Sequence, residues 1–325
     1  IIKAPAVLEK IDTCRIAIFD KTGTLTYGEP VLTEILPGEG FQENEVLTLV
    51  ASLERYSKHP LSSAVLKAAR ETGAPLSDAS QISERPGEGL RGVVSGRSIL
   101  ITNRKKPAVQ YPELTGKLSP SGVGMECVVL IDERYAATCR FRDEPRTDGA
   151  TFIQHLGPRH QFDRVLLVSG DRESEVRYLA ERVGIAEVYF SQTPEQKLEL
   201  VRKETKLANT LFMGDGINDA PAMTAATVGI AFGRNSDITA EAAGVVVLDS
   251  SLQKVDELLH ISRRLRSIAL QSAVGGMALS LIGMFFAAGG YLLPVAGAIF
   301  QEVIDVIAVA NALRVAIPPR KLSDY

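Results

Sequence analysis

Short apolar runs separated by longer amphipathic stretches dominate two parts of the chain. One run covers residues 16–19, and the later runs cover residues 165–168, 188–190, 210–213, 228–232 and 245–248. Runs of this length that are rich in β-branched residues predict buried strands, and the amphipathic stretches between them predict helices. Strands that alternate with helices are typical of a parallel sheet. The pattern therefore predicts an α/β fold with helices flanking the sheet.

Residues 32–135 separate the first apolar run from the others and differ from them in sequence pattern. This segment contains more turns and several glycines and prolines. These residues punctuate local structure and interrupt the strand–helix alternation. We expect this segment to form an inserted lobe of its own.

The end of the chain changes character. No charged residue occurs from Ser267 to Gln301, and the apolar character continues to Ile317. This length suits two membrane-spanning helices of about 20 residues each. Residues 289–291, followed by Pro294, offer the turn between them. The alternative is a buried helical pair of a soluble protein.

Basic residues flank this predicted hairpin on both sides, which places both of its ends in the cytoplasm. They are Arg263, Arg264 and Arg266 before it and Arg314, Arg320 and Lys321 after it.

Composition narrows the function classes. A net charge of -3 over 325 residues gives no case for nucleic-acid binding. Cys14, Cys127 and Cys139 form no CxxC pair, which argues against a disulfide framework and favours a reducing compartment. His155 and His160 lie around a Gly-Pro turn, and we expect them at the surface.

The most informative motif is Asp20-Lys21-Thr22-Gly23-Thr24, directly after the first apolar run. A carboxylate at a strand end can accept a phosphoryl group if cations and hydrogen-bond donors offset the oxygen charges. Lys21 brings a cation, the two threonines bring hydroxyls, and Gly23 allows a sharp turn. The motif predicts an aspartyl-phosphate nucleophile.

Three further phosphate-site elements follow. Ser169-Gly170-Asp171 and the segment 214–219 each come directly after an apolar run, and Lys197 opens an amphipathic helix. Asp20 and Asp215 are suitable magnesium ligands, because Mg²⁺ prefers a few oxygen ligands together with waters and phosphate. The carboxyl ends of parallel strands meet at one edge of a sheet, so we expect these side chains to converge.

Together these motifs resemble those of the heavy-metal-translocating P-type ATPases, with Ser169 where that family usually has threonine. The resemblance implies a Rossmann-like haloacid-dehalogenase phosphorylation domain, an inserted α+β nucleotide-binding domain and a two-helix transmembrane hairpin. The implied division is 1–14 for the end of a stalk helix, 15–31 and 136–260 for the phosphorylation domain, 32–135 for the nucleotide-binding domain, 267–317 for the two transmembrane helices and 318–325 for a cytoplasmic tail.

The same resemblance implies the residue roles. In the phosphorylation site they fall to Asp20, Lys21, Thr22, Thr24, Ser169, Gly170, Asp171, Lys197, Asn218 and Asp219, with Mg²⁺ held by Asp20, the Thr22 carbonyl and Asp215. ATP would be bound by Glu54, His59, Gly87, Gly89, Asn103, Asp143 and Arg146. An imidazole can stack on a purine while a nearby carboxylate accepts from its amino group. Thr102 and Lys58 depart from the family pattern in this lobe.

Glu302 and Asp305 are candidate ligands of the transported metal. They are three residues apart and share a helix face in an apolar segment. Placing a carboxylate within a membrane-spanning segment costs free energy, so such residues indicate an ion pathway. Alternatively, they lie near the membrane edge or neutralise a basic group on another helix. Oxygen ligands favour a divalent cation, whereas Met277 and Met284 keep copper(I) as an alternative.

We therefore expect part of an ATP-driven exporter of a divalent Zn/Cd/Co-like cation, a multi-pass cell-membrane protein with cytoplasmic catalytic domains. The actuator domain and earlier membrane helices would be supplied by a missing N-terminal half. The alternatives are a copper(I) pump, a haloacid-dehalogenase phosphatase and a non-catalytic membrane regulator. Such phosphatases usually carry a second aspartate two residues after the nucleophile, and here that position is Thr22.

Overall fold

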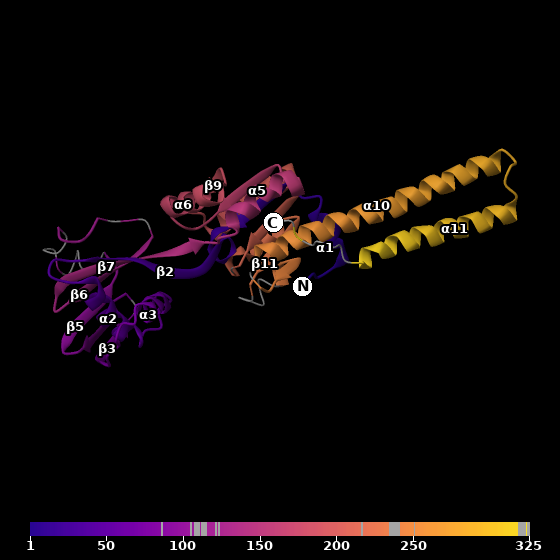
Figure 1. The fold of residues 1–325 in the computed structure, drawn as a ribbon. Helices are drawn as coiled ribbons and strands as arrows, with labels where there is room; N and C mark the ends of the chain where they lie inside the picture. The colour runs from indigo at the N-terminus through magenta and orange to yellow at the C-terminus, as the bar shows by residue number, and fades with distance from the viewer. Residues whose placement is uncertain are drawn as a thin grey trace. The chain divides into compact units, whose positions relative to one another are not determined.

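The structure is a computed structural model that describes residues 1–85, 87–104, 106, 111, 116–120, 122, 124–215, 217–233, 241–249, 251–317 and 323. It divides into two compact units. The first comprises Ile1–Leu25 and Arg146–Tyr325, and the second comprises Thr26–Pro145 (Figure 1).

The first unit alternates strands and helices along the chain. Its elements are α1 (Pro5–Ile11), β1 (Ile16–Asp20), α5 (Gly149–His160), β8 (Arg164–Val168), α6 (Glu173–Val183), β9 (Glu187–Tyr189), α7 (Pro194–Leu207), β10 (Thr210–Gly214), α8 (Ala220–Ala225), β11 (Val228–Phe232), β12 (Val245–Val247), α10 (Leu252–Ala288) and α11 (Pro294–Ala312). The predicted strands agree with these bounds to within one residue at each end.

The six strands of this unit form one parallel sheet in the order β12-β11-β10-β1-β8-β9. Successive side chains of β1 point to opposite faces, so Ala17 and Phe19 join one hydrophobic core while Ile16 and Ile18 join another. Residues of α1, α5, α6 and α10 complete the first core, and residues of α7 and α8 complete the second. The chain leaves β1 toward β8 on one side and returns to β10 on the other, which makes the carboxyl end of β1 the topological switch point where ligands bind.

The second unit is an antiparallel sheet in the order β2-β7-β6-β5-β4-β3. Its elements are β2 (Thr26–Pro37), α2 (Glu43–Glu54), α3 (Ser62–Glu71), β3 (Ala79–Arg85), β4 (Gly89–Val94), β5 (Arg97–Thr102), β6 (Met125–Ile131) and β7 (Arg134–Pro145). Both helices pack on one face of the sheet in a single core. The unit is wider than the predicted lobe at residues 32–135, because β2 and β7 pair all the way back to Thr26 and Pro145.

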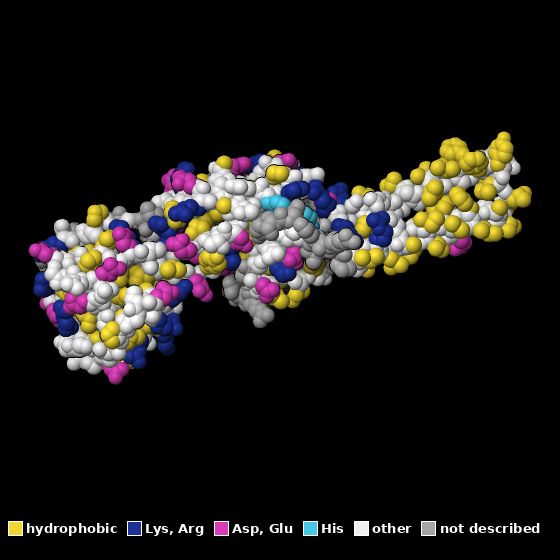
Figure 2. Space-filling view, viewed as in Figure 1, with side chains coloured by type: hydrophobic (Ala, Val, Ile, Leu, Met, Phe, Trp, Pro, Cys, Tyr) yellow, Lys and Arg dark blue, Asp and Glu magenta, His cyan; other side chains and the backbone are white. Residues whose placement is uncertain are grey.

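The hairpin begins inside a longer helix than the charge pattern suggests. α10 is continuous over 37 residues, and its first turns contribute Leu252, Val255 and Leu258 to the core of the first unit. Beyond these turns, both arms expose apolar side chains, which cover the hairpin in Figure 2. Both helices are long and apolar enough to cross a membrane, and only 11% and 6% of their most apolar windows are buried. Within the described residues, the two arms are therefore not buried as the core helices of a soluble domain would be.

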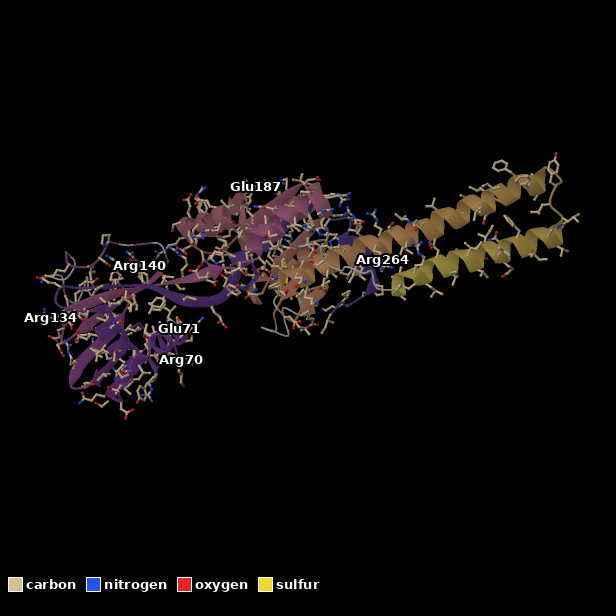
Figure 3. All side chains as sticks on the ribbon, viewed as in Figure 1. Arg70, Glu71, Arg134, Arg140, Glu187 and Arg264 are labelled. Atoms are coloured by element: carbon tan, nitrogen blue, oxygen red, sulfur yellow. The ribbon has the colours of Figure 1, made fainter. Side chains whose placement is uncertain are left out.

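Arginines hold the open end of the hairpin. The Arg264 guanidinium donates to the carbonyl of Arg314 at 2.8 Å, and Figure 3 labels Arg264 on α10 near the end of α11. Arg314 in turn donates to Asn311 at 2.8 Å. Arg320, Lys321 and the predicted tail at 318–325, apart from residue 323, lie outside the described residues.

The expectation that His155 and His160 lie at the surface is wrong for His160, which is 8% exposed. Both residues belong to α5, which packs against α10. Their environment therefore depends on a helix that follows about a hundred residues later in the chain, and the local sequence carries no sign of it.

Candidate active site

Asp20 ends β1 at the switch point, with a side chain that is almost completely buried. The turn that follows folds back on this carboxylate, because the backbone N–H of Thr22 donates to Asp20 Oδ2 at 3.1 Å. Gly23 has a φ of +67°, and a Cβ there would lie 1.9 Å from Asp215 Oδ2. Only glycine fits this position, and its absent side chain lets Asp215 approach the turn.

Lys197 reaches the same carboxylate from α7. The helix begins with a capping box between Thr193 and Gln196, which fixes its first turn. From that turn Lys197 Nζ donates to Asp20 Oδ1 at 2.5 Å and to Asp219 Oδ1 at 2.8 Å. The structure therefore brings Asp20, Lys197 and Asp219 into one hydrogen-bonded group, although Asp20 precedes Lys197 by 177 residues.

Burial and charge shift the pKa values of this group. Burial, reinforced by the negative charge of Asp219, raises the pKa of Asp20 to about 7 in spite of Lys197. Burial acts to lower the pKa of Lys197, but the charges of Asp20 and Asp219 outweigh it and raise that pKa to about 12. Lys197 is thus a cation at neutral pH. The charged form of Asp20 is disfavoured by burial, and further positive charge beside it would stabilise that form.

The Ser169-Gly170-Asp171 segment follows β8 at the same edge. The backbone N–H of Asp171 donates to the Ser169 hydroxyl at 3.1 Å, and Lys21 pairs with the Asp171 carboxylate at 2.5 Å. Lys21 therefore anchors the loop after β8 to the turn after β1. The hydroxyl of Thr24 is completely buried and has no hydrogen-bond partner among the described residues. A buried hydroxyl without a partner is costly and is suited to a phosphoryl oxygen.

The carboxylates of Asp20, Asp215 and Asp219 offer ligand atoms that all lie within 4.8 Å of one another. Lys197 pairs with two of these three carboxylates, Asp20 and Asp219, and Lys21 pairs with Asp171 nearby. Carboxylate oxygens are the hard ligands that Mg²⁺ prefers, so these three residues fit the ion that the motifs predict. Asn218 is exposed beside them, whereas Gly216 of the same motif lies outside the described residues.

Stability should respond to pH and Mg²⁺ at this site. The pKa of Asp20 rises from 3.8 to about 7 on folding, so the folded protein holds this proton more tightly than the unfolded chain. Without Mg²⁺, the free energy of unfolding should therefore fall as pH rises from about 4 to about 7. Mg²⁺ should raise the Tm by several degrees at pH 8 and by much less at pH 5, in thermal unfolding monitored by circular dichroism. A larger effect at pH 5 would contradict the assignment, and Asp20→Asn should flatten the difference.

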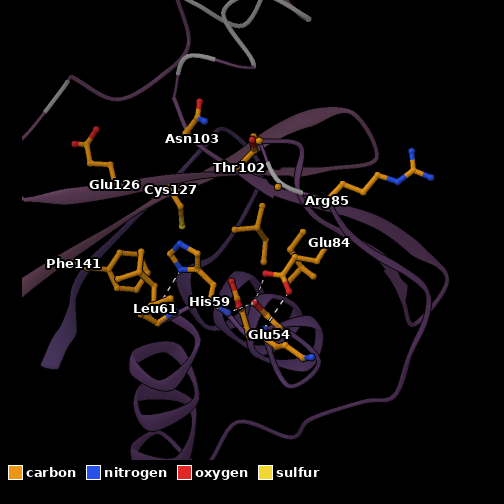
Figure 4. A pocket seen from close by; sticks show the side chains of 17 residues that line it. Glu54, His59, Leu61, Glu84, Arg85, Thr102, Asn103, Glu126, Cys127 and Phe141 are labelled. Atoms are coloured by element: carbon orange, nitrogen blue, oxygen red, sulfur yellow. Dashed lines mark hydrogen bonds between the residues drawn. The ribbon is translucent and has the colours of Figure 1, made fainter. Parts of the chain in front are cut away.

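The second unit contains a cavity of about 550 Å³ between the turn that follows α2, residues 57–61, and the strands of the sheet. Its lining includes five residues to which sequence analysis assigned ATP binding: Glu54, His59, Gly87, Gly89 and Asn103. These residues come from separate parts of the lobe, and the fold brings them together (Figure 4). Gly89 has a φ of +84°, and a Cβ there would lie 2.3 Å from the carbonyl oxygen of Ile101. The backbone of β4 therefore approaches β5 closely at the pocket wall.

The His59 ring is oriented by a backbone N–H group two residues later. The Leu61 backbone N–H donates to His59 Nδ1 at 3.2 Å, which leaves the ring proton on Nε2. Figure 4 shows this ring directed into the pocket toward Cys127. The imidazole thus presents a flat face and one N–H to a ligand, as purine stacking requires.

Carboxylates on two sides of the pocket are held by local hydrogen bonds. Glu54 accepts from the Ser62 hydroxyl at 2.6 Å, and burial raises its pKa. Glu84 accepts from the Ser57 hydroxyl at 2.7 Å and from the Lys58 backbone at 3.1 Å. Sequence analysis missed Glu84, which lies on β3 and carries no motif. Its contacts to Ser57 and Lys58 fix the turn that presents His59.

Thr102, which replaces a glycine of the family pattern, continues β5 without distortion and pairs in register with Val128. Its hydroxyl is buried and has no hydrogen-bond partner in the described part of the chain. The neighbouring Asn103 lines the pocket beside it.

Asp143 and Arg146 lie near the end of the insertion in sequence, and their side chains form hydrogen bonds with residues 23–28 near its beginning. The Asp143 carboxylate accepts from the Gly28 backbone at 2.9 Å and also from the Thr26 hydroxyl. The Arg146 guanidinium donates to the carbonyls of Thr24 at 2.8 Å and Gly23 at 3.3 Å. In this structure Arg146 therefore supports the turn after Asp20, and its predicted role with nucleotide stays a prediction.

Glu302 and Asp305 lie on α11 and are both exposed in this chain. The Gln301 side chain links this region to α10, because it accepts from Ser280 at 3.1 Å and donates to Asp305 at 3.2 Å. Asn311 makes a second polar link by donating to Ser272 at 2.9 Å. Polar side chains thus hold the two arms together within an apolar hairpin.

A parallel sheet with a buried aspartate at its switch point is the arrangement of a known class of phosphoryl-transfer domain. The sequence pattern of the haloacid dehalogenase-like hydrolases matches residues 14–227, and the chain belongs to this family. Within that family it is homologous to the metal-transporting P-type ATPases. It is 33% identical to the cadmium, zinc and cobalt-transporting ATPase of Bacillus subtilis over 97% of this chain and 45% of the relative. It is also 33% identical to copper-transporting ATPase 2 of Rhizobium meliloti over 94% of this chain and 38% of the relative.

Two solved structures of ATPases are also similar to this chain. A zinc-transporting PIB-type ATPase in the E2·Pi state superimposes with a TM-score of 0.81 at 30% identity, over 97% of this chain and 52% of that one. The catalytic domain of the CPx-ATPase CopB-B gives a TM-score of 0.65 at 28% identity, over 80% of this chain and 94% of that one. The chain spans less than half the length of the two curated relatives.

Proposed function

We propose that this chain performs the phosphorylation step of ATP-driven heavy-metal export, with Asp20 as the residue that accepts the γ-phosphoryl group. The observation that carries the proposal is the convergence of Asp20, Lys197, Asp215 and Asp219 at the carboxyl edge of the sheet. The nucleotide pocket in the second unit supports ATP as the donor.

In this reaction a carboxylate oxygen of Asp20 forms a bond to the γ-phosphorus, the bond between that phosphorus and the β,γ-bridging oxygen breaks, and ADP leaves. Lys197 offsets the oxygen charge that persists through the transfer, and the unpartnered Thr24 hydroxyl is available to donate to a phosphoryl oxygen. Asp20, Asp215 and the carbonyl of Thr22 would hold Mg²⁺, which neutralises phosphate charge when bound.

The residue at position 22 distinguishes the proposed function from that of a phosphatase. The side chain of Thr22 cannot act as a general acid or base near neutral pH, so no residue of the turn is equipped to activate a water for rapid dephosphorylation. This favours a long-lived phosphoenzyme, as a pump requires. A non-catalytic regulator would not need the complete set of Asp20, Lys197 and Asp215, and failure to bind ATP would support it.

His59→Gln should weaken ATP binding on the order of tenfold, because stacking on one base contributes about 1–3 kcal/mol. The phosphorylation rate at saturating ATP should change little. Isothermal titration with a nonhydrolysable ATP analogue measures the affinity, and Lys67→Gln, at an exposed position of α3 outside the pocket lining, serves as the control. Unchanged affinity in His59→Gln would remove the base-stacking role.

We assign the transported ion to the divalent Zn/Cd/Co class, with Glu302 and Asp305 as its ligands within the membrane. The oxygen donors on α11 support this class, because copper(I) prefers thiolate and thioether ligands. Met277 and Met284 are exposed on α10, and they support copper(I) as the second candidate.

Metal-stimulated ATP hydrolysis by the complete natural protein tests this assignment. A divalent ion should stimulate turnover, and Glu302→Ala or Asp305→Ala should reduce that stimulation at least tenfold while phosphorylation from ATP remains possible. Stimulation by copper(I) alone, or normal stimulation in both variants, would overturn the divalent assignment.

A further inference from the structure

Three of the four histidines of the chain meet around one buried aspartate, and none of these residues belongs to the motifs already described. His155 and His160 come from α5, and Asp256 and His260 come from α10. We refer to these four residues as the histidine cluster. Asp256 and His260 are four residues apart and share one helix face, which is directed at α5. In Figure 2 histidine side chains reach the surface of the first unit.

The ring nitrogens converge on the carboxylate. Nε2 of His160 lies 2.7 Å from Asp256 Oδ1, and Nε2 of His155 lies 3.3 Å from the same oxygen. Nε2 of His260 lies 3.6 Å from Oδ2. One ligand atom from each residue can be chosen so that all four lie within 4.8 Å of one another. A tetrahedral zinc site with bonds of about 2.0–2.1 Å needs ligand atoms about 3.3 Å apart, so small side-chain rotations suffice.

Asp256 is the strongest indication that this cluster binds an ion. Its side chain is 0% exposed, and its Oδ2 accepts no hydrogen bond from the residues that the structure describes. Among the residues that the structure describes, the groups that lie within ion-pair distance of Asp256 are His155, His160 and His260, and a histidine is neutral or charged according to its surroundings. A buried carboxylate that lacks a permanent cation is costly, and a bound metal ion would remove that cost.

Access and ligand chemistry narrow the choice of ion. The His260 side chain is 28% exposed, compared with 3% for His160, so the cluster opens toward solvent on the His260 side. Imidazole nitrogens with one carboxylate suit zinc and its neighbours and are poor ligands for Mg²⁺ or Ca²⁺. The absence of sulfur ligands from the cluster disfavours copper(I).

We propose that His155, His160, Asp256 and His260 bind one divalent transition-metal ion of the zinc class, at a site separate from both the phosphorylation site and α11. The ion joins α5 of the sheet domain to the first turns of α10, the helix that continues into the apolar hairpin. Metal availability then controls how firmly these two helices are connected. The site does not depend on the proposed transport activity.

The test uses Co²⁺ as a spectroscopic substitute for Zn²⁺ on the full chain in detergent, with excess Mg²⁺ present to occupy the carboxylates around Asp20. A four-coordinate site gives Co²⁺ intense visible absorption bands, and Zn²⁺ should displace it. His155→Ala and His260→Ala should each weaken binding at least tenfold, since even second-shell changes at metal sites cost about 10–100-fold. His59→Ala, which changes the histidine outside the cluster, should leave the bands unchanged.

A second variant locates the ion. Glu302→Ala combined with Asp305→Ala should retain the cobalt bands, and loss of the bands in this variant would place the ion in the hairpin and overturn the proposal. Absence of bands in the wild-type chain, or bands that survive in both His155→Ala and His260→Ala, would overturn it as well. Circular dichroism checks that each variant is folded, and Zn²⁺ should raise the Tm of the wild-type chain but not of His155→Ala.

Discussion

Asp20→Asn is expected to abolish phosphoenzyme formation, with a loss of at least about 10³-fold in the rate of phosphoryl transfer. The amide has nearly the shape of the carboxylate but cannot act as the nucleophile. It also removes one of three crowded carboxylates, so the variant should fold at least as stably as the wild-type chain at pH 8. ATP affinity should be retained, because the pocket in the second unit is unchanged.

The measurement is incorporation of ³²P from γ-labelled ATP into acid-quenched protein, with release by hydroxylamine to identify an acyl phosphate. Asp163→Asn is a matched control, because it makes the same chemical change at an exposed position of the same unit. Equal labelling of Asp20→Asn and the control would exclude Asp20 as the acceptor and with it the proposed mechanism.

Lys197→Met should have the second largest effect. Lys197 is the cation shared by Asp20 and Asp219, and methionine keeps much of its length without its charge. Removing one preorganised electrostatic contact typically lowers a transfer rate by about 10²–10³-fold. Asp20 would also lose the positive charge that opposes the rise in its pKa, so less of it would be ionised near neutral pH.

Lys203→Met, at an exposed position of the same helix, controls for the loss of a lysine from α7. The Tm of Lys197→Met should fall more at pH 8 than at pH 5, because the buried carboxylates repel one another only when ionised. Labelling kinetics equal to those of Lys203→Met would show that Lys197 takes no part in the transfer.

Much of this site could be predicted from sequence because its residues follow buried strands. Apolar runs marked the strands, and polar residues directly after them had to meet at one edge of a parallel sheet. That reasoning correctly brings Asp20, Ser169 and Asp215 to the same edge. It did not foresee the pairing of Lys21 with Asp171, and the role of Lys21 at the phosphoryl group stays a prediction.

Residues whose roles depend on packing between distant segments were not predictable in this way. Glu84 carries no motif and lines the pocket of the second unit only because β3 lies beside the turn at Ser57. Arg146 follows a charged turn in the sequence, yet its guanidinium reaches back to carbonyls more than a hundred residues earlier. The histidine cluster is the clearest case, since it requires the docking of α10 on α5.

The pairing of β2 with β7 has a consequence for how this chain folds. β1 pairs with β8 and β10, which follow it in the chain only after an insertion of more than a hundred residues. Contacts between residues that distant in sequence slow folding. Thr26 and Pro145 lie opposite each other, so an insertion that folds first brings its two ends together. For the strands outside it, the intervening chain is then reduced to a short link, which lowers the entropic cost of closing the β1–β8 loop by about 1.5 kcal/mol. The inserted lobe can thereby assist the assembly of the sheet that it interrupts.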